Sequence, residues 1–410
     1  MAGTGESTGE RMRRWNGPAL FSYGFRPMFL LAGLASVAAM ALWVAMLTGR
    51  IDPPRPWDGV GWHVHAFLFG YMGAVLAGFL LTAVPNWTGR MPVVGWPLAA
   101  LAVLWLVGAL LHWFLPACGL WIEPAFLPLL SFLLWREIIA GNNRRNIPVA
   151  ALVSLLALAH IVFDLEVATD GAALDGAALR TAIAAVVLLV SLIGGRVTPS
   201  FTRNWLVQRR DPHLPTPFGR FDRVTMGLSA AGLLGWVLLP QNGASGALLL
   251  AAGLAHLVRL ARWKGARTFA EPLVLVLHVA YFFVPVGFVL TGLAALTGQV
   301  PAVAGLHGWL VGAMGMMTLA VMTRASLGHT GRPLHAGPSI AAIYVLVLIA
   351  ALARIAAAFS PGNIALLELS ATAWIAAFAL FVLRFAPVLL GPRPARRRPG
   401  RSPGGAETRG

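Results

Sequence analysis

Two histidines two residues apart open a long apolar stretch at Trp62-His63-Val64-His65. Apolar residues continue almost unbroken to Val84, so both imidazoles belong to a segment of membrane character. Imidazole is a common ligand of iron and copper, and ionisable residues inside membrane spans usually mark a site. On a helix, residues i and i+2 point about 200° apart. His63 and His65 are therefore expected to serve separate sites, or to divide into one ligand and one hydrogen-bonded histidine.

The two faces of this helix distinguish the two histidines. His63 shares its face with small residues, which permit close helix packing, namely Gly70, Ala74, Ala77 and Gly78. We therefore favour His63 as the inward-facing ligand. His65 lies over bulkier side chains. It either serves a second site or has its imidazole hydrogen-bonding needs met at the outer membrane interface.

Other histidines lie inside apolar runs. His278 sits in the middle of one, in Leu277-His278-Val279-Ala280-Tyr281, and His307 opens another at a depth comparable to that of His63. The predicted cofactor-binding residues, which are also predicted metal ligands, are His63, His65, His278 and His307. For each of them, the alternative is a histidine satisfied by a backbone carbonyl or by water.

Three more histidines are added as predicted metal ligands: His160, His256 and His329. Asp164 follows His160 by four residues on the same helix face, where its carboxylate can orient the imidazole. The remaining histidines, His112, His213 and His335, are interpreted as solvated or interfacial.

Other chemistry is poorly represented in the sequence. There is no glycine-rich phosphate loop, no Cys/His zinc spacing and no nucleophile elbow, so no catalytic residue is predicted. The single cysteine, Cys118, excludes an intramolecular disulfide, and there is no Cys-x-x-Cys-His for covalent haem attachment. Any haem would be held by coordination and packing alone.

The elements that must position these histidines are membrane helices. Of the 410 residues, 58% are hydrophobic and 11% are charged, roughly half the charged fraction of a soluble protein. Apolar runs reach about 20 residues, enough to cross a bilayer. We predict an all-α polytopic membrane protein with twelve spans, at about 27–48, 60–84, 93–114, 118–136, 147–168, 177–198, 224–240, 244–263, 270–297, 302–325, 337–359 and 363–391.

The basic residues predict orientation. The net charge of +16 is concentrated in short loops between spans, which argues against nucleic acid as a partner. Of the 31 lysines and arginines, only Arg50, Arg55, Arg180 and Arg354 fall outside one set of alternate loops and the ends. Both termini are therefore expected to be cytoplasmic. We divide the chain into a flexible N-terminus (1–15), one membrane domain (16–392) and a disordered basic tail (393–410).

The second, sixth and tenth spans end in similar sequences. These are Thr82-Ala83-Val84-Pro85-Asn86, Thr198-Pro199-Ser200-Phe201-Thr202 and Met322-Thr323-Arg324. Three arcs of four helices would explain the similarity. The alternative is that short cytoplasmic loops favour threonine, glycine and arginine in any case.

Several motifs together resemble the NnrS family of bacterial inner-membrane proteins. They are Leu20–Phe29, Trp62–His65 with Leu68–Tyr71, Gly78–Gly89, Leu277–Tyr281, and Met317–Arg324 continuing to Gly328–Arg332. The resemblance covers residues 16–392. Family members usually have Glu where this chain has Ala66-Phe67. Their fifth span more often carries Asn and then His where this chain has His160 and Asp164.

The resemblance implies haem b and copper as cofactors, a multi-pass location in the bacterial inner membrane, and a part in nitric oxide stress response or denitrification. Membrane histidines would then hold metal that binds or turns over NO or an NO-derived species. No electron donor is evident from the sequence. The alternative from another class is a transporter of a metal or a metal–nitrosyl species that uses the same histidines transiently. A third is a scaffold or cofactor-assembly role.

Overall fold

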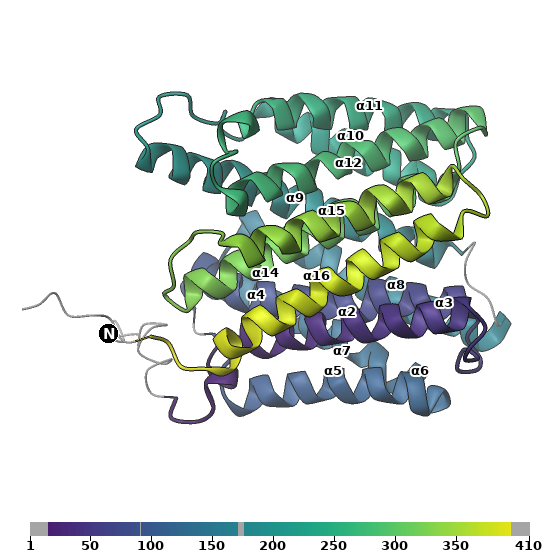
Figure 1. The fold of residues 1–410 in the computed structure, drawn as a ribbon, viewed down its shortest axis with the longest axis horizontal. Helices are drawn as coiled ribbons and strands as arrows, with labels where there is room; N and C mark the ends of the chain where they lie inside the picture. The colour runs from purple at the N-terminus through teal and green to yellow at the C-terminus, as the bar shows by residue number, and fades with distance from the viewer. Residues whose placement is uncertain (1–14, 91, 171–175, 395–410) are drawn as a thin grey trace, which may run out of the picture.

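The computed structural model describes residues 15–90, 92–170 and 176–394. Nearly all of the expected flexible N-terminus and disordered tail lies outside these residues. The described residues form a helical bundle without strands, and long helices run side by side across it (Figure 1). The prediction of an all-α polytopic membrane protein is confirmed.

The first half of the bundle holds six hydrophobic segments in chain order. Two of them are assembled from shorter helices, with a π-helix (η2, Ala66–Tyr71) or a 3-10 turn (η3, Glu123–Ala125) in the middle. The six are α2 (Phe25–Leu47), α3–η2–α4 (Gly59–Thr88), α5 (Trp96–Phe114), α6–η3–α7 (Pro116–Ala140), α8 (Ile147–Asp170) and α9 (Ala177–Gln208).

The second half adds six further helical segments. One of them contains a second π-helix, η6 (Gly308–Gly315). The six are α10 (Arg220–Leu238), α11 (Gly243–Ala261), α12 (Pro272–Thr297), α13–η6–α14 (Ala302–His329), α15 (Pro338–Ala358) and α16 (Ile364–Leu390).

The number of spans agrees closely with the prediction. Among the described residues, eleven helices are long and apolar enough to cross a membrane. The predicted span at 224–240 corresponds to α10, which begins with charged residues and packs along α9 and α11. The two ends of the bundle's chain meet, because the Arg26 guanidinium donates hydrogen bonds to the carbonyls of Leu389 (2.9 Å) and Gly391 (2.7 Å). An even number of crossings is needed for this meeting, and α10 would bring the eleven to the predicted twelve.

The second, sixth, ninth and tenth segments lie deepest in the bundle, and three of these four are four spans apart. The most apolar windows of Gly59–Thr88, Ala177–Gln208 and Ala302–His329 are 89%, 67% and 72% buried within the protein. Most other spans are at or below 50%, apart from Pro272–Thr297 at 67%. Central helices four spans apart support the three-arc arrangement, which stays a prediction.

Each π-helix begins directly after a histidine. His65 precedes η2 and His307 precedes η6. Glycines follow both histidines at the same spacing, five and eight residues on, at Gly70 and Gly73 and at Gly312 and Gly315. π-turns inside helices are frequent at functional sites.

Packing of η6 on α12 depends on one of these glycines. A Cβ at Gly312 would lie 2.3 Å from the Phe283 ring. We expect Gly312→Ala to lower the melting midpoint of the purified protein by about 1–3 °C, since overpacking costs about 1–3 kcal/mol. Gly243→Ala is the control, because no atom lies within 4 Å of its added Cβ. Equal midpoints for the two variants in a detergent melting assay would contradict this view of the contact.

Candidate metal centre

Five buried side chains with metal-binding chemistry converge on one point of the first half of the bundle. They come from four elements and are His65 at the end of α3 (Gly59–His65), His112 in α5, Glu123 in η3, and His160 and Asp164 in α8. None is more than 5% exposed. We call these five residues the histidine–carboxylate cluster.

One triad within the cluster joins α3 to α8. The Nε2 atom of His65 lies 2.9 Å from Nε2 of His160 and 3.3 Å from Oδ1 of Asp164. Nε2 of His160 lies 3.4 Å from Oδ2 of Asp164. The spacing of four residues in α8 therefore does place the imidazole and the carboxylate together, as the sequence indicated.

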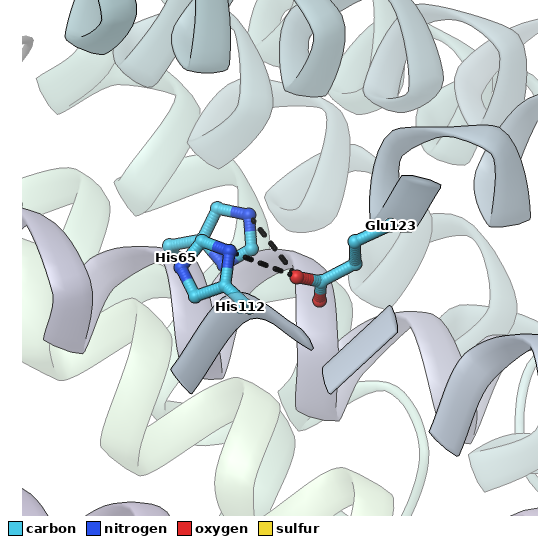
Figure 2. A group of neighbouring side chains, drawn as sticks. All are labelled: His65, His112 and Glu123. Carbon is cyan, nitrogen blue, oxygen red and sulfur yellow. Dashed lines mark ion pairs between the residues drawn. The ribbon is translucent and has the colours of Figure 1, made fainter. Parts of the chain in front are cut away.

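A second triad shares His65 and adds α5 and η3. Nδ1 of His112 lies 3.1 Å from Oε2 of Glu123, and Nε2 of His65 lies 3.7 Å from the same oxygen. The rings of His65 and His112 stack with centroids 3.8 Å apart. Figure 2 shows the two imidazoles side by side, with the Glu123 carboxylate directed at both.

Local packing explains how Glu123 reaches the cluster. A Cβ at Gly108 would lie 3.2 Å from Cγ of Glu123, so glycine at this position of α5 makes room for the acid. Nearby, the Trp105 indole donates a 3.0 Å hydrogen bond to the Gly70 carbonyl and ties α5 to η2. The pair of helices α5 and α6 (Pro116–Ile122) turns back sharply, which brings Glu123 beside His112.

Many polar atoms of the cluster lack hydrogen-bond partners. They are Nδ1 of His65 and His160, both ring nitrogens of His112, Oε2 of Glu123 and both carboxylate oxygens of Asp164. Leaving a buried polar group unpaired costs about 1–3 kcal/mol, and several together are rare in native proteins. Apart from the 2.9 Å hydrogen bond between the Nε2 atoms of His65 and His160, these groups approach one another without hydrogen-bond geometry, as ligands do around a common ion.

Aromatic side chains enclose the cluster. Trp57 is 3% exposed and lies over both stacked imidazoles, with ring centroids 4.9 Å from His65 and 4.5 Å from His112. Phe69 stacks on His160 at 4.2 Å. This apolar shell keeps water away from the imidazole and carboxylate groups.

The distances suit a first-row transition metal. Ligands at about 2.0–2.1 Å from one ion, and about 90–110° apart, lie roughly 2.9–3.4 Å from each other. Most of the contacts above fall in this range. Each triad has two imidazoles and one carboxylate, a set typical of non-haem iron, while imidazole also suits copper and zinc. Two ionised carboxylates would balance the charge of a divalent ion.

His63, the favoured inward ligand, lies elsewhere. Its ring stacks on Trp43 of α2 with centroids 4.7 Å apart, so the expectation that His63 and His65 face different surroundings agrees with the structure. Of the two, His65 is the more deeply buried, at 1% exposed within the cluster against a partly buried His63, and the choice between them as metal ligands stays a prediction. His307 donates its Nδ1 hydrogen to the Val303 carbonyl at 2.8 Å, which leaves Nε2 as the ring's free lone pair.

The other histidines predicted as ligands stand apart from the cluster. His278 pairs through Nε2 with the Thr202 hydroxyl at 2.8 Å. Both ring nitrogens of His256 are engaged, with Ser229 at 2.8 Å and Tyr281 at 3.0 Å.

The remaining histidines lie toward the helix ends and loops. His329 ends α14 (Met316–His329) and stacks on Tyr23 at 5.3 Å. Of the three expected to be solvated, His213 and His335 are exposed, but His112 is 3% exposed and was wrongly placed at an interface.

Sequence reasoning missed Glu123 as well as His112. The available signal was an ionisable residue within an apolar run, Trp121-Ile122-Glu123-Pro124. Such residues are costly in a membrane and usually face a bundle interior. Their pairing with His65 could not be read from the chain, because it depends on how α5, η3 and α3 pack.

Comparison with known proteins agrees with this architecture. No curated protein matches the chain. A family model described as NnrS protein matches residues 19–393, which is most of the chain. The chain therefore belongs to the NnrS family, and it is a multi-pass membrane protein of that family.

Proposed function

We propose that this protein is an inner-membrane metalloprotein of the nitric oxide response or of denitrification. In this proposal it binds or turns over NO, or a species derived from NO, at a metal held by histidines. The observation that carries the proposal is the histidine–carboxylate cluster, in which buried imidazole and carboxylate groups converge and most of their polar atoms lack hydrogen-bond partners.

Copper or iron in the cluster would be held by His65 and His160 with Asp164, and by His112 with Glu123. The donor set fits either metal, because imidazole binds both and the carboxylates supply balancing charge. When bound, such a metal supplies the affinity for NO. Trp57 and Phe69 pack on the imidazoles of His65 and His160 and help to exclude water from the site.

Haem b, if present, fits different residues. His63 and His307 have partly buried rings, and Arg354 lies within electrostatic range of both. The backbone hydrogen bond at Nδ1 of His307 fixes the tautomer that leaves Nε2 for a metal, as is usual for ligating histidines. Arg354 is a cation suited to pair with a propionate.

The test of the cluster is the metal content of the protein purified in detergent, measured by mass spectrometry after growth with copper and iron. We expect copper or iron that resists mild chelation and whose electron paramagnetic resonance spectrum changes when NO is added. Metal that mild chelation removes would favour the transporter instead. Protein that binds neither metal would exclude the proposal.

The haem assignment has its own prediction. The purified protein is expected to show a Soret band, and His307→Ala is expected to lose most of it because the imidazole proposed to hold the haem iron is gone. His213→Ala, on an exposed loop, should retain the band. A colourless wild-type protein, or an unchanged band in His307→Ala, would rule out this haem site while leaving the cluster untouched.

A further inference from the structure

A pocket lies on the outer face of the bundle, between α6, η3 and the start of α7 (Phe126–Ala140) on one side and α8 on the other. Its volume is about 250 Å³. Apolar side chains form nearly all of its wall, including Trp121, Ala125, Ile161 and Ala168. The one ionisable residue in the wall is Asp164.

Asp164 connects this pocket to the histidine–carboxylate cluster. Its side chain is 3% exposed, and its Oδ1 atom lies 3.3 Å from Nε2 of His65. The pocket therefore ends at a carboxylate that is itself a member of the cluster. Both carboxylate oxygens lack hydrogen-bond partners. A ligand bound in the pocket would therefore contact Asp164, which is itself a residue of the cluster.

The rim of the pocket belongs to the lipid-facing surface. Trp121 is 70% exposed and Leu165 is 44% exposed, on helices that cross the membrane. Tryptophan at the end of a span is typical of the membrane interface. The pocket thus opens sideways, toward acyl chains and the interface, rather than into an aqueous vestibule.

We propose that this pocket is the binding and access site for a small uncharged ligand that reaches the cluster from the lipid phase. The inference rests on the proposed function for the nature of the cluster. Enclosed apolar cavities of comparable size bind apolar molecules such as benzene or xenon, and this pocket offers similar walls with one side open to lipid. A diatomic gas such as NO fits the volume with room to move.

The chemistry of the wall also selects against ions. Nitrite or nitrate would find no cationic or hydrogen-bond-donating side chain among the lining residues, and would meet the Asp164 carboxylate at the inner end. Burying an unpaired charge in apolar surroundings is strongly unfavourable. The pocket is accordingly a site for the uncharged gas and not for its oxidised anions.

The test fills the pocket without touching the cluster. Ala168→Trp and Ala125→Trp each place an indole in the pocket from an exposed position, on opposite walls. Ala151→Trp is the matched control, because Ala151 is exposed on α8 but lies outside the pocket lining. Two readouts are used in nanodiscs: xenon binding followed by ¹²⁹Xe NMR, which needs no metal, and the rate of NO binding after rapid mixing with metal-loaded protein.

We expect Ala168→Trp and Ala125→Trp to lose the xenon signal seen in wild type and in Ala151→Trp. NO binding should slow by at least about tenfold in both, with metal content unchanged. Wild-type protein without a xenon site would overturn the proposal. So would an unchanged NO rate in filled variants that keep their metal. Xenon binding in a protein that takes up no metal would exclude the proposed function. It would still support the pocket as a binding site for uncharged gases.

Discussion

Replacing His65 with alanine is expected to abolish metal binding at the histidine–carboxylate cluster. His65 is the residue that both triads share, with Nε2 close to His160, Asp164 and Glu123. Without it, each triad keeps one imidazole and one carboxylate, too few for a stable site. Substituting a residue that only hydrogen-bonds to a metal ligand already lowers metal affinity by about 10–100-fold. Loss of a ligand that both triads share should therefore exceed that range.

The neighbouring histidine supplies the control. His63→Ala changes the same residue type two positions away, where the ring stacks on Trp43 outside the cluster. It should keep the full stoichiometry of non-haem metal, measured by mass spectrometry of the purified variants after subtraction of the haem iron determined from the absorption spectrum. His112→Ala should lie between the two, because it leaves the triad of His65, His160 and Asp164 complete. A His65→Ala protein that melts like wild type and still binds stoichiometric metal would refute the assignment.

Removing the Asp222 carboxylate is expected to destabilise the opposite half of the bundle severely. Asp222 lies 2.9 Å from Nε of Arg259, whose side chain is fully buried. Arg259 also donates hydrogen bonds to the Tyr281 hydroxyl at 2.6 Å and to the Ser191 carbonyl at 3.1 Å. Asp222→Ala would leave an unpaired guanidinium in the interior, which costs about 3–5 kcal/mol.

Two further variants separate the effect of the unpaired Arg259 charge on stability from other effects of the substitution. Asp222→Ala combined with Arg259→Met removes both members of the pair and should recover much of the lost stability. Arg90→Ala breaks the ion pair between Arg90 and Glu137, in which Arg90 is 43% exposed, and should cost less than about 1 kcal/mol. The measurement is the midpoint of unfolding in mixed detergent micelles with increasing denaturing detergent. A single Asp222→Ala variant as stable as Arg90→Ala would show that the buried pair contributes little.

The helices could be predicted from the sequence because bilayer thickness imposes their length and the loops carry the positive charge. Side-chain neighbours within one helix could also be predicted, since His160 and Asp164 are four residues apart and their side chains lie in contact. Glu123 and His112 required packing between segments, which local periodicity does not contain. Their roles as metal ligands remain a proposal on the same footing as that of His65.

The preference for His63 over His65 as the inward-facing ligand rested on one geometric assumption. It assigned Gly70, Ala74 and Gly78 to the face of His63 by assuming regular turns of 3.6 residues. The π-helix at Ala66–Tyr71 has wider turns, so the residues after it are rotated relative to those before it. The small residues are accordingly split: Gly78 of α4 (Met72–Thr88) faces α2, on which His63 also packs, whereas Gly70 faces Glu123 of the cluster. A second rotation of this kind follows His307, in η6.

The contact between the two ends of the bundle has a consequence for biosynthesis. Arg26, near the start of the first span, is 5% exposed and finds its acceptors in the carbonyls of Leu389 and Gly391. At about 5–20 residues per second, the ribosome needs roughly 20–70 s after making Arg26 to supply them. During that interval the first helix is in the bilayer while its guanidinium must be hydrated at the interface. Closure of the first span against the last is thus a late step of assembly, which follows insertion of every other helix.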